Sequence, residues 1–148
     1  MKKPASHRRW QADPLSFQRL LNKLQPFSEP ERLRLELPIR LSFEALRTGQ
    51  GSESDFHDLA AAINVTMIRA ETAGAEAEQA AIAAHDALMR VWRRWQRASK
   101  WQFCGSDLAD IEDGIGLHEQ FIVLSTPQQM INAGNEAIRR GAVGEVVV

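Results

Sequence analysis

The sequence contains one cysteine, no tyrosine and no hydrophobic run long enough to cross a membrane. The single cysteine, Cys104, excludes a framework of intrachain disulfide bonds. A membrane-spanning helix needs roughly 20 consecutive apolar residues, and no stretch approaches that length. The N-terminal stretch MKKPASHRRWQ is charged and lacks the apolar core of a secretion signal. We therefore expect a cytoplasmic protein with no membrane attachment.

The chain also lacks an excess of charge of either sign. It has 18 Lys and Arg residues against 19 Asp and Glu residues, for a net charge of −1. This balance excludes a uniformly basic nucleic-acid-binding chain. The charges are nevertheless uneven, because residues 1–50 carry ten Lys and Arg against five acids and residues 102–148 carry two against seven. Such polarity can orient a partner or a second subunit, and in a short chain it can equally arise by chance.

What the sequence does have is helical periodicity in a chain of 148 residues, of which 44% are hydrophobic and 25% charged. These values are ordinary for one soluble domain. Alanine is abundant, and two capping boxes, Ser28–Glu31 and Thr126–Gln129, mark helix starts. We expect an all-α fold, a single-domain bundle of about five or six helices over residues 14–141. A basic N-terminal arm, residues 1–13, precedes the bundle, and a short apolar C-terminal tail, residues 142–148, follows it.

The segment around Pro38 allows two interpretations. Its apolar residues alternate from Leu33 to Phe43 as in a β-strand, whereas the preceding capping box and the spacing of Phe43 and Leu46 indicate a helix. We favour the helix. An interior proline removes one hydrogen bond and clashes with the preceding turn, so we expect a kink or a break at Pro38.

Glycines and helical spacing delimit the later helices. Gly74 is expected to separate two helices, and the longest helix is expected from Ala75 to Ser99. The next helix is weakened by Gly114 and Gly116. Its expected inward-facing residues are Leu108, Ile111, Ile115, His118 and Ile122.

The stretch RVWRRWQRASKW, residues 90–101, holds three of the four tryptophans. At about 100° per residue its arginines share one arc of a helix, and Trp92 and Trp95 lie on the opposite side. We expect these indoles to face the bundle and the guanidinium groups to face water. The arginines then complement the helix dipole or bind an anionic partner, and only Trp101 can stack on a base beside them. The candidate surface for an anionic partner consists of Arg8, Arg9, Arg90, Arg93, Arg94, Arg97, Lys100 and Trp101.

Two His-Asp doublets, His57-Asp58 and His85-Asp86, raise the question of a metal-dependent enzyme. The all-helical phosphohydrolases of the HD type bind divalent metal through a histidine, a His-Asp doublet and a distant aspartate. The resemblance here is limited to the dipeptides. The simpler interpretation makes His57 a surface or capping residue and His85 a satisfied histidine at the edge of the core.

No other polar cluster has a stronger catalytic pattern. The acidic run DLADIED, residues 107–113, lacks the spacing and the central glycine of an EF-hand loop, and acids are common in the first turn of a helix. Cys104 and His118 have no third group in evidence to orient them as a nucleophile and a base. We therefore expect no enzymatic activity, no cofactor and no metal site.

Three stretches carry a resemblance to a known group of proteins: HRRWQADPLSFQRLL near the start, ESDFHDLAAAIN in the middle and LSTPQQM near the end. They resemble uncharacterised small helical proteins encoded by proteobacterial phages, plasmids and integrated mobile elements. The resemblance implies an accessory or regulatory role in a mobile genetic element, exercised through binding. It transfers no site residue to this chain.

These observations favour a non-enzymatic helical binding or accessory protein that acts through protein–protein interaction and forms a homo-oligomer. The candidate self-association residues are Val146, Val147 and Val148, because three valines are costly to leave in water. One alternative is a transcriptional regulator that binds nucleic acid through the basic Arg/Trp face. A second alternative is a metal-dependent phosphohydrolase of the HD type.

Overall fold

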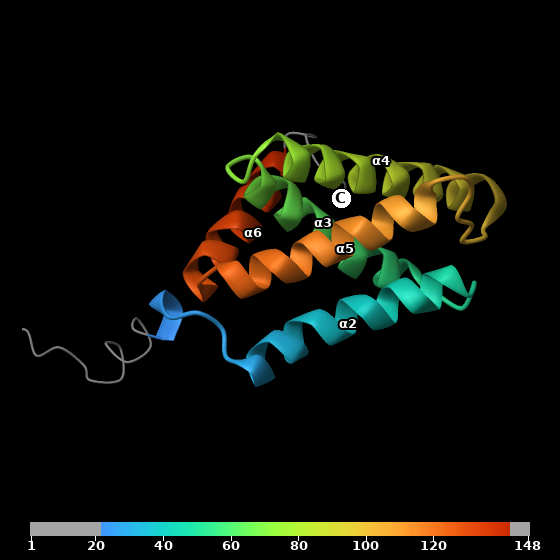
Figure 1. Ribbon diagram of the computed structural model, residues 1–148. Helices are drawn as coiled ribbons and strands as arrows, with labels where there is room; N and C mark the ends of the chain where they lie inside the picture. Colours follow the sequence, from blue (N-terminus) through green and yellow to red (C-terminus); the bar gives the residue numbers. More distant parts are fainter. Residues whose placement is uncertain (1–21, 143–148) are drawn as a thin grey trace, which may run out of the picture.

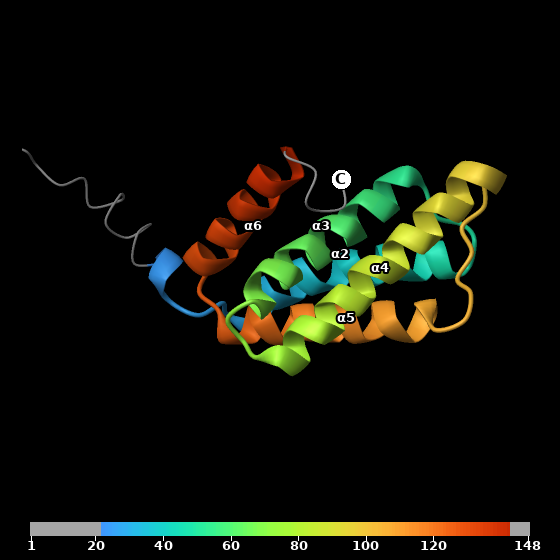
Figure 2. The ribbon, with the colours of Figure 1, turned by 90° about the horizontal axis from the view of Figure 1, so that it is seen from above.

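The computed structural model describes residues 22–142, which contain helices and no strand. The expected all-α bundle is confirmed (Figures 1 and 2). The basic arm, residues 1–13, and residues 143–148 of the apolar tail lie outside the described residues. None of the described helices is long and apolar enough to span a lipid bilayer. The helices are α2 (Glu29–Arg47), α3 (Glu53–Ala70), α4 (Ala75–Ala98), α5 (Asp107–Leu124) and α6 (Pro127–Ala142).

Reciprocal side-chain caps determine where three of these helices begin. Before α2, the Glu31 N–H donates to the Ser28 hydroxyl at 3.4 Å, and the Ser28 N–H donates to the Glu31 carboxylate at 2.7 Å. Each cap satisfies backbone donors that have no partner inside the helix. The two predicted capping boxes are therefore confirmed. The equivalent pairs are Ser52 with Asp55 at α3 and Thr126 with Gln129 at α6.

Pro38 does not break α2, which continues from Glu29 to Arg47. The expected break is wrong, and so is the strand interpretation of this segment. The helix tolerates the lost hydrogen bond because its C-terminal half is anchored in the core: Phe43 and Leu46 are buried, and Ile39 packs against the same cluster. Tertiary packing of this kind regularly outweighs local propensity.

Helix α3 lies at the centre of the bundle, in contact with α2, α4, α5 and α6. Figure 2 shows α4 crossing above α5, and α6 set apart beside α3. Gly74, with φ of 107°, separates α3 from α4 as expected. The main core cluster includes the buried side chains of Phe43, Leu46, Phe56, Leu59, Ile63, Leu88, Val91, Ile111 and Ile115.

The inward face of α5 is confirmed for four of its five expected residues. Ile111, Ile115, His118 and Ile122 are buried, whereas Leu108 is 37% exposed. Leu108 lies in the first turn of α5, about 70° around the helix from the centre of the buried arc, so its expected burial is wrong.

Candidate functional site

The tryptophans of residues 90–101 belong to a cluster of four stacked rings at one end of the bundle. Trp92 stacks on Phe56 and on Trp95, with ring centroids 4.9 Å apart in both cases. Trp101 stacks on Trp95 at 5.2 Å and on Phe56 at 5.5 Å, and its Nε1–H donates to the Gly51 carbonyl at 2.8 Å. The expectation that Trp92 and Trp95 face the bundle is confirmed. Trp101, the only ring of this stretch that could stack on a base beside the arginines, is engaged by the protein itself.

Two of the arginines in this stretch neutralise a buried carboxylate. Asp107, at the start of α5, is 1% exposed, and it accepts hydrogen bonds from Arg90 Nε at 2.9 Å and Arg94 Nη1 at 2.5 Å. A buried carboxylate needs such partners, because the charge alone would be costly to desolvate. The expectation that all the guanidinium groups face water is therefore wrong for Arg90 and Arg94.

The pKa of Asp107 reflects these contacts. Burial by itself raises the pKa of the carboxyl group, but the Cys104 N–H and the guanidinium groups of Arg94 and Arg90 stabilise the charged form more strongly. The Cys104 N–H donates to Oδ2 at 2.9 Å. The pKa of Asp107 consequently lies below its ordinary value.

The remaining cations of the candidate anionic-partner surface are Arg93, Arg97 and Lys100, all exposed near the end of α4. The Arg97 Nε donates to the Arg93 carbonyl at 3.3 Å, so these two residues stand one turn apart. Arg8 and Arg9 lie outside the described residues. So do the candidate self-association residues Val146, Val147 and Val148.

The two His-Asp doublets lie apart. His57 is exposed at the start of α3, with its ring 5.8 Å from that of Trp92. His85 lies seven residues before Trp92, which is about 10 Å along α4. Its Nδ1 is 3.2 Å from Asp86 Oδ1, and its buried Nε2 has no hydrogen-bond partner within residues 22–142. Nowhere in this part of the chain do three or more His, Cys, Asp and Glu side chains gather in a group that could hold a metal ion.

The other polar clusters are similarly dispersed or engaged. Asp110 accepts from the Ser106 hydroxyl at 2.9 Å and lies 3.6 Å from Arg90 Nη2, so it belongs to the same ion-pair group as Asp107. Cys104 is exposed and precedes α5, whereas His118 is buried about 16 Å along that helix. The structure does not bring these two side chains together.

A groove that the sequence did not predict runs between α2, α3, α5 and α6, with a volume of about 660 Å³. Its lining is mostly apolar, and α6 forms one wall because it packs on α3 and leaves a gap toward α2. No local sequence pattern indicates the groove, since it depends on the distance between helices that are not neighbours in the chain. The apolar lining includes Leu35, Ala62, Val65, Ile122, Met130 and Ile131.

His118 forms a polar part of the groove lining. The Thr66 hydroxyl lies 3.0 Å from His118 Nδ1 and donates to the Ala62 carbonyl at 2.8 Å. Because the hydroxyl has a single proton, it accepts a hydrogen bond from Nδ1–H, and Nε2 is left as an acceptor. Burial lowers the pKa of His118 to about 4, so the imidazole is neutral at physiological pH.

Charges of opposite sign border the groove on facing helices. Arg34 of α2 and Asp58 of α3 are exposed, and neither forms a salt bridge within residues 22–142. The Ser42 hydroxyl lies 3.3 Å from Asp55 Oδ1 and sets the register of these antiparallel helices. Counted from that contact, Arg34 and Asp58 are offset by five residues, or about 8 Å, along the groove.

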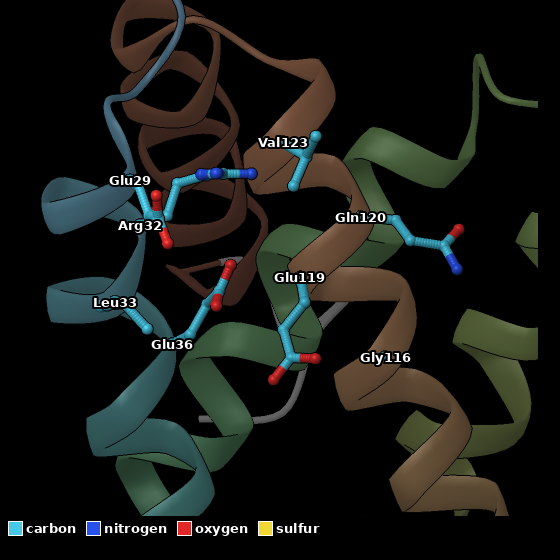
Figure 3. A pocket seen from close by; sticks show the side chains of 8 residues that line it. All are labelled: Glu29, Arg32, Leu33, Glu36, Gly116, Glu119, Gln120 and Val123. Atoms are coloured by element: carbon cyan, nitrogen blue, oxygen red, sulfur yellow. The ribbon is translucent and has the colours of Figure 1, made fainter.

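A smaller hollow of about 490 Å³ lies on the other side of α2, against α5 (Figure 3). It combines the apolar side chains of Leu33 and Val123 with charged groups, including Glu36 and Glu119. Next to it, Arg40 binds Glu119 through two hydrogen bonds of 2.6 and 2.8 Å, which tie α2 to α5.

Comparison of the chain with protein families, with curated proteins and with solved structures finds no significant match. The candidate site therefore rests on the geometry of the bundle.

Proposed function

We propose that this chain is a non-enzymatic binding protein that takes an amphipathic helix of a partner protein into the groove between α2, α3, α5 and α6. The observation that carries the proposal is the apolar groove of about 660 Å³ with a cation and an anion on its facing rims. Grooves of this kind bind a helix through apolar side chains spaced three, four and seven residues apart.

The shape of the groove favours a helix over a compact small molecule. A second hollow of about 340 Å³ shares Phe27, Arg34, Leu35 and Pro127 with it, and it extends the apolar surface toward the start of α2. The stretch of α3 from Asp58 to Val65 along the wall is about 10 Å long, which corresponds to two helical turns of an occupant.

In this proposal, the rim charges select the charge pattern and the direction of the partner helix. A helix that carries an acidic residue opposite Arg34 and a basic residue opposite Asp58, about five residues apart, satisfies both rims at once. The reverse order places like charges together, which is unfavourable. The neutral imidazole of His118 adds a hydrogen-bond acceptor and no charge.

An accessory or regulatory role in a mobile genetic element belongs to the same proposal. It rests on the resemblance of three sequence stretches to proteins of phages, plasmids and integrated elements. Binding to a partner protein agrees with such a role, because an accessory protein acts on other proteins.

The test uses a synthetic helix with leucines at positions i, i+3 and i+7, one glutamate and one lysine five residues apart. We expect this probe to bind the full chain, as followed by the fluorescence of a dye on the peptide. Ala61→Trp, at an exposed position in the groove, should weaken binding at least about tenfold by filling the space. Ala98→Trp, at an exposed position at the end of α4, is the matched control and should bind as the wild type does.

A second probe with the glutamate and lysine exchanged tests the rim charges. The wild type should bind it more weakly, and the double variant Arg34→Asp with Asp58→Arg should reverse the preference. Equal binding of both probes by the wild type, or equal binding by the Ala61→Trp and Ala98→Trp variants, would rule out this groove as the site.

A further inference from the structure

Helix α2 presents a row of leucines to solvent on the side opposite the core. Leu33, Leu37 and Leu41 are 55%, 57% and 61% exposed, although they lie in a well-packed helix. At about 100° per residue they fall within an arc of about 80°, centred opposite Leu46, which is fully buried. An apolar row of this kind marks an interaction surface, because single exposed leucines are common and aligned ones are not. We call these three residues the leucine row.

The charged residues beside the leucine row alternate in sign along α2. They spread over about 120° of the helix, from the flank that faces α5, where Arg40 contacts Glu119, to the leucine row itself, where Glu44 lies. Each acidic residue has a basic residue at the same distance on the other side of Pro38, so the order of charges reverses sign about that residue. The three pairs are Glu29 with Arg47, Arg32 with Glu44, and Glu36 with Arg40.

We propose that α2 is a self-association surface, on which α2 of a second copy of this chain packs in the antiparallel direction. A two-fold axis near Leu37 and Pro38 brings the same flank of both helices together in reverse order. Every acidic residue then meets a basic residue of the second copy. In a parallel pair this charge match is lost. The flank that carries the alternating charges then faces the other flank of α2 in the second copy. The leucine row is centred on Leu37, one residue from the centre of the charge pattern, so the register that pairs the leucines differs from the register that pairs the charges by two residues, or about 3 Å along the helix.

The hollow between α2 and α5 provides a place for a side chain of the second copy. Leu33 and Leu41 are equidistant from Leu37, so Leu41 of the second copy lies opposite Leu33. Leu33 also lines the hollow, together with Val123, which is 47% exposed (Figure 3). The two-fold axis creates this contact twice, once at the hollow of each copy. Insertion of Leu41 of the second copy into the hollow follows the usual way in which helices pack, with side chains of one helix between those of the other.

Arg32, one member of these pairs, carries a buried polar atom. The Nε of Arg32 is buried and has no hydrogen-bond partner within residues 22–142. A buried donor without an acceptor is costly and rare. Glu44, the counterpart of Arg32 in the charge pattern, binds Arg47 of its own chain, and in the antiparallel pair its carboxylate lies opposite the Arg32 guanidinium group.

The first test measures the mass of the full chain by light scattering over a wide range of concentration. We expect twice the 16.6-kDa chain mass at high concentration. Leu37→Asp, at an exposed position, should raise the dissociation constant at least about a hundredfold while the circular dichroism spectrum is unchanged. Leu124→Asp is the matched control, because Leu124 is 75% exposed outside the leucine row, and this variant should associate as the wild type does.

The second test fixes the direction of the pair by disulfide cross-linking in a Cys104→Ser background. Residues 33 and 41 are about 12 Å apart along α2, and a disulfide needs Cα atoms closer than about 7 Å. A mixture of the Leu33→Cys and Leu41→Cys chains should therefore cross-link to each other, and Leu37→Cys should cross-link to itself. In the antiparallel pair, Leu33→Cys alone should not form a disulfide-linked dimer.

Three results would overturn the proposal. The first is a wild type that stays at the single-chain mass at all concentrations, as it also would if another part of the chain covered the leucine row. The second is a dimer that Leu37→Asp leaves intact. The third is efficient self-cross-linking of Leu33→Cys, which indicates a parallel pair. Any of these three leaves the groove-binding function open to its own peptide test.

Discussion

Gly114 of α5 lies against Ala84 of α4 so closely that a Cβ atom at Gly114 would overlap the Cβ of Ala84. The same atom would stand 3.0 Å from Ile63 Cδ1 of α3. The absent side chain therefore allows three helices to approach at the centre of the core. Two positions along, a Cβ at Gly116 would meet nothing within 4 Å.

This contrast predicts opposite effects of the same substitution. Gly114→Ala should lower the free energy of unfolding by about 2 kcal/mol, because the core has no room for the methyl group. Gly116→Ala should raise it by about 0.5–1 kcal/mol, because alanine is the better helix former at an open position. Urea unfolding followed by circular dichroism measures both values. A Gly114→Ala variant as stable as the wild type would contradict the close packing of α4 and α5.

Asp107 joins the end of α4 to the start of α5, and its charge is expected to stabilise the fold. Asp107→Asn weakens the contacts with Arg90 and Arg94 and should cost about 2 kcal/mol at neutral pH. The cost stays modest because Arg90 is 41% exposed and can be hydrated once its partner is lost. Asp113→Asn, at an exposed position of the same helix, is the control and should change little.

The pH dependence of that variant has a definite sign. The pKa of Asp107 lies below its ordinary value in the folded state, so the carboxylate stabilises the fold above the unfolded-state pKa of about 4. The contribution is lost as the pH falls through the folded-state pKa. The difference in unfolding free energy between the wild type and Asp107→Asn should therefore shrink in acid. A difference that grows toward low pH would show that the pKa is raised.

His118 predicts a second, separate dependence on pH. Its pKa is about 4 in the fold and about 6.5 when unfolded, so the unfolded chain binds more protons between these values. Stability should accordingly fall as the pH drops from about 6.5 to 4, by up to about 3 kcal/mol. His118→Gln should lose this slope, whereas His57→Gln, at an exposed site, should keep it. Denaturant titrations at several pH values compare the slopes, and identical slopes in all three proteins would contradict the assignment.

The exposed cations at the end of α4 are expected to have no part in groove binding. Arg93→Glu combined with Arg97→Glu should leave the affinity for the helical probe unchanged, because neither residue lines the groove. The same double variant tests the alternative of nucleic-acid binding. Binding of a DNA duplex that weakens with salt in the wild type and disappears in the double variant would support that alternative.

The helices were predictable from the sequence because their signals are local. The Ser28–Glu31 box and Gly74 act within a few residues, and each begins or ends a helix where expected. The direction of Trp92 and Trp95 was predictable for a similar reason, since helical spacing alone places them opposite the arginines. Pro38 was misleading, because its local cost is offset by core contacts made elsewhere in α2.

The candidate sites were not predictable, because they depend on which helices become neighbours. Arg90 and Arg94 have the spacing of a solvated face, and only the packing of α5 on α4 brings Asp107 to them. The groove likewise exists only because α6 packs on α3 away from α2. The exposure of Leu37 was hidden by the alternation of apolar residues in α2, which gives no single inward face.

Leu35 and Leu37 are two residues apart in α2, yet one lines the groove and the other points away from the bundle. A dimer whose two-fold axis passes near Leu37 would therefore carry two grooves, one on each copy. Such an assembly is bivalent: once one helix of a repeated or dimeric target is held, the second meets its groove at a high effective concentration. Modest affinity at each groove would then add up to strong avidity, and a dimer-breaking substitution would weaken capture of such a target without touching the groove itself.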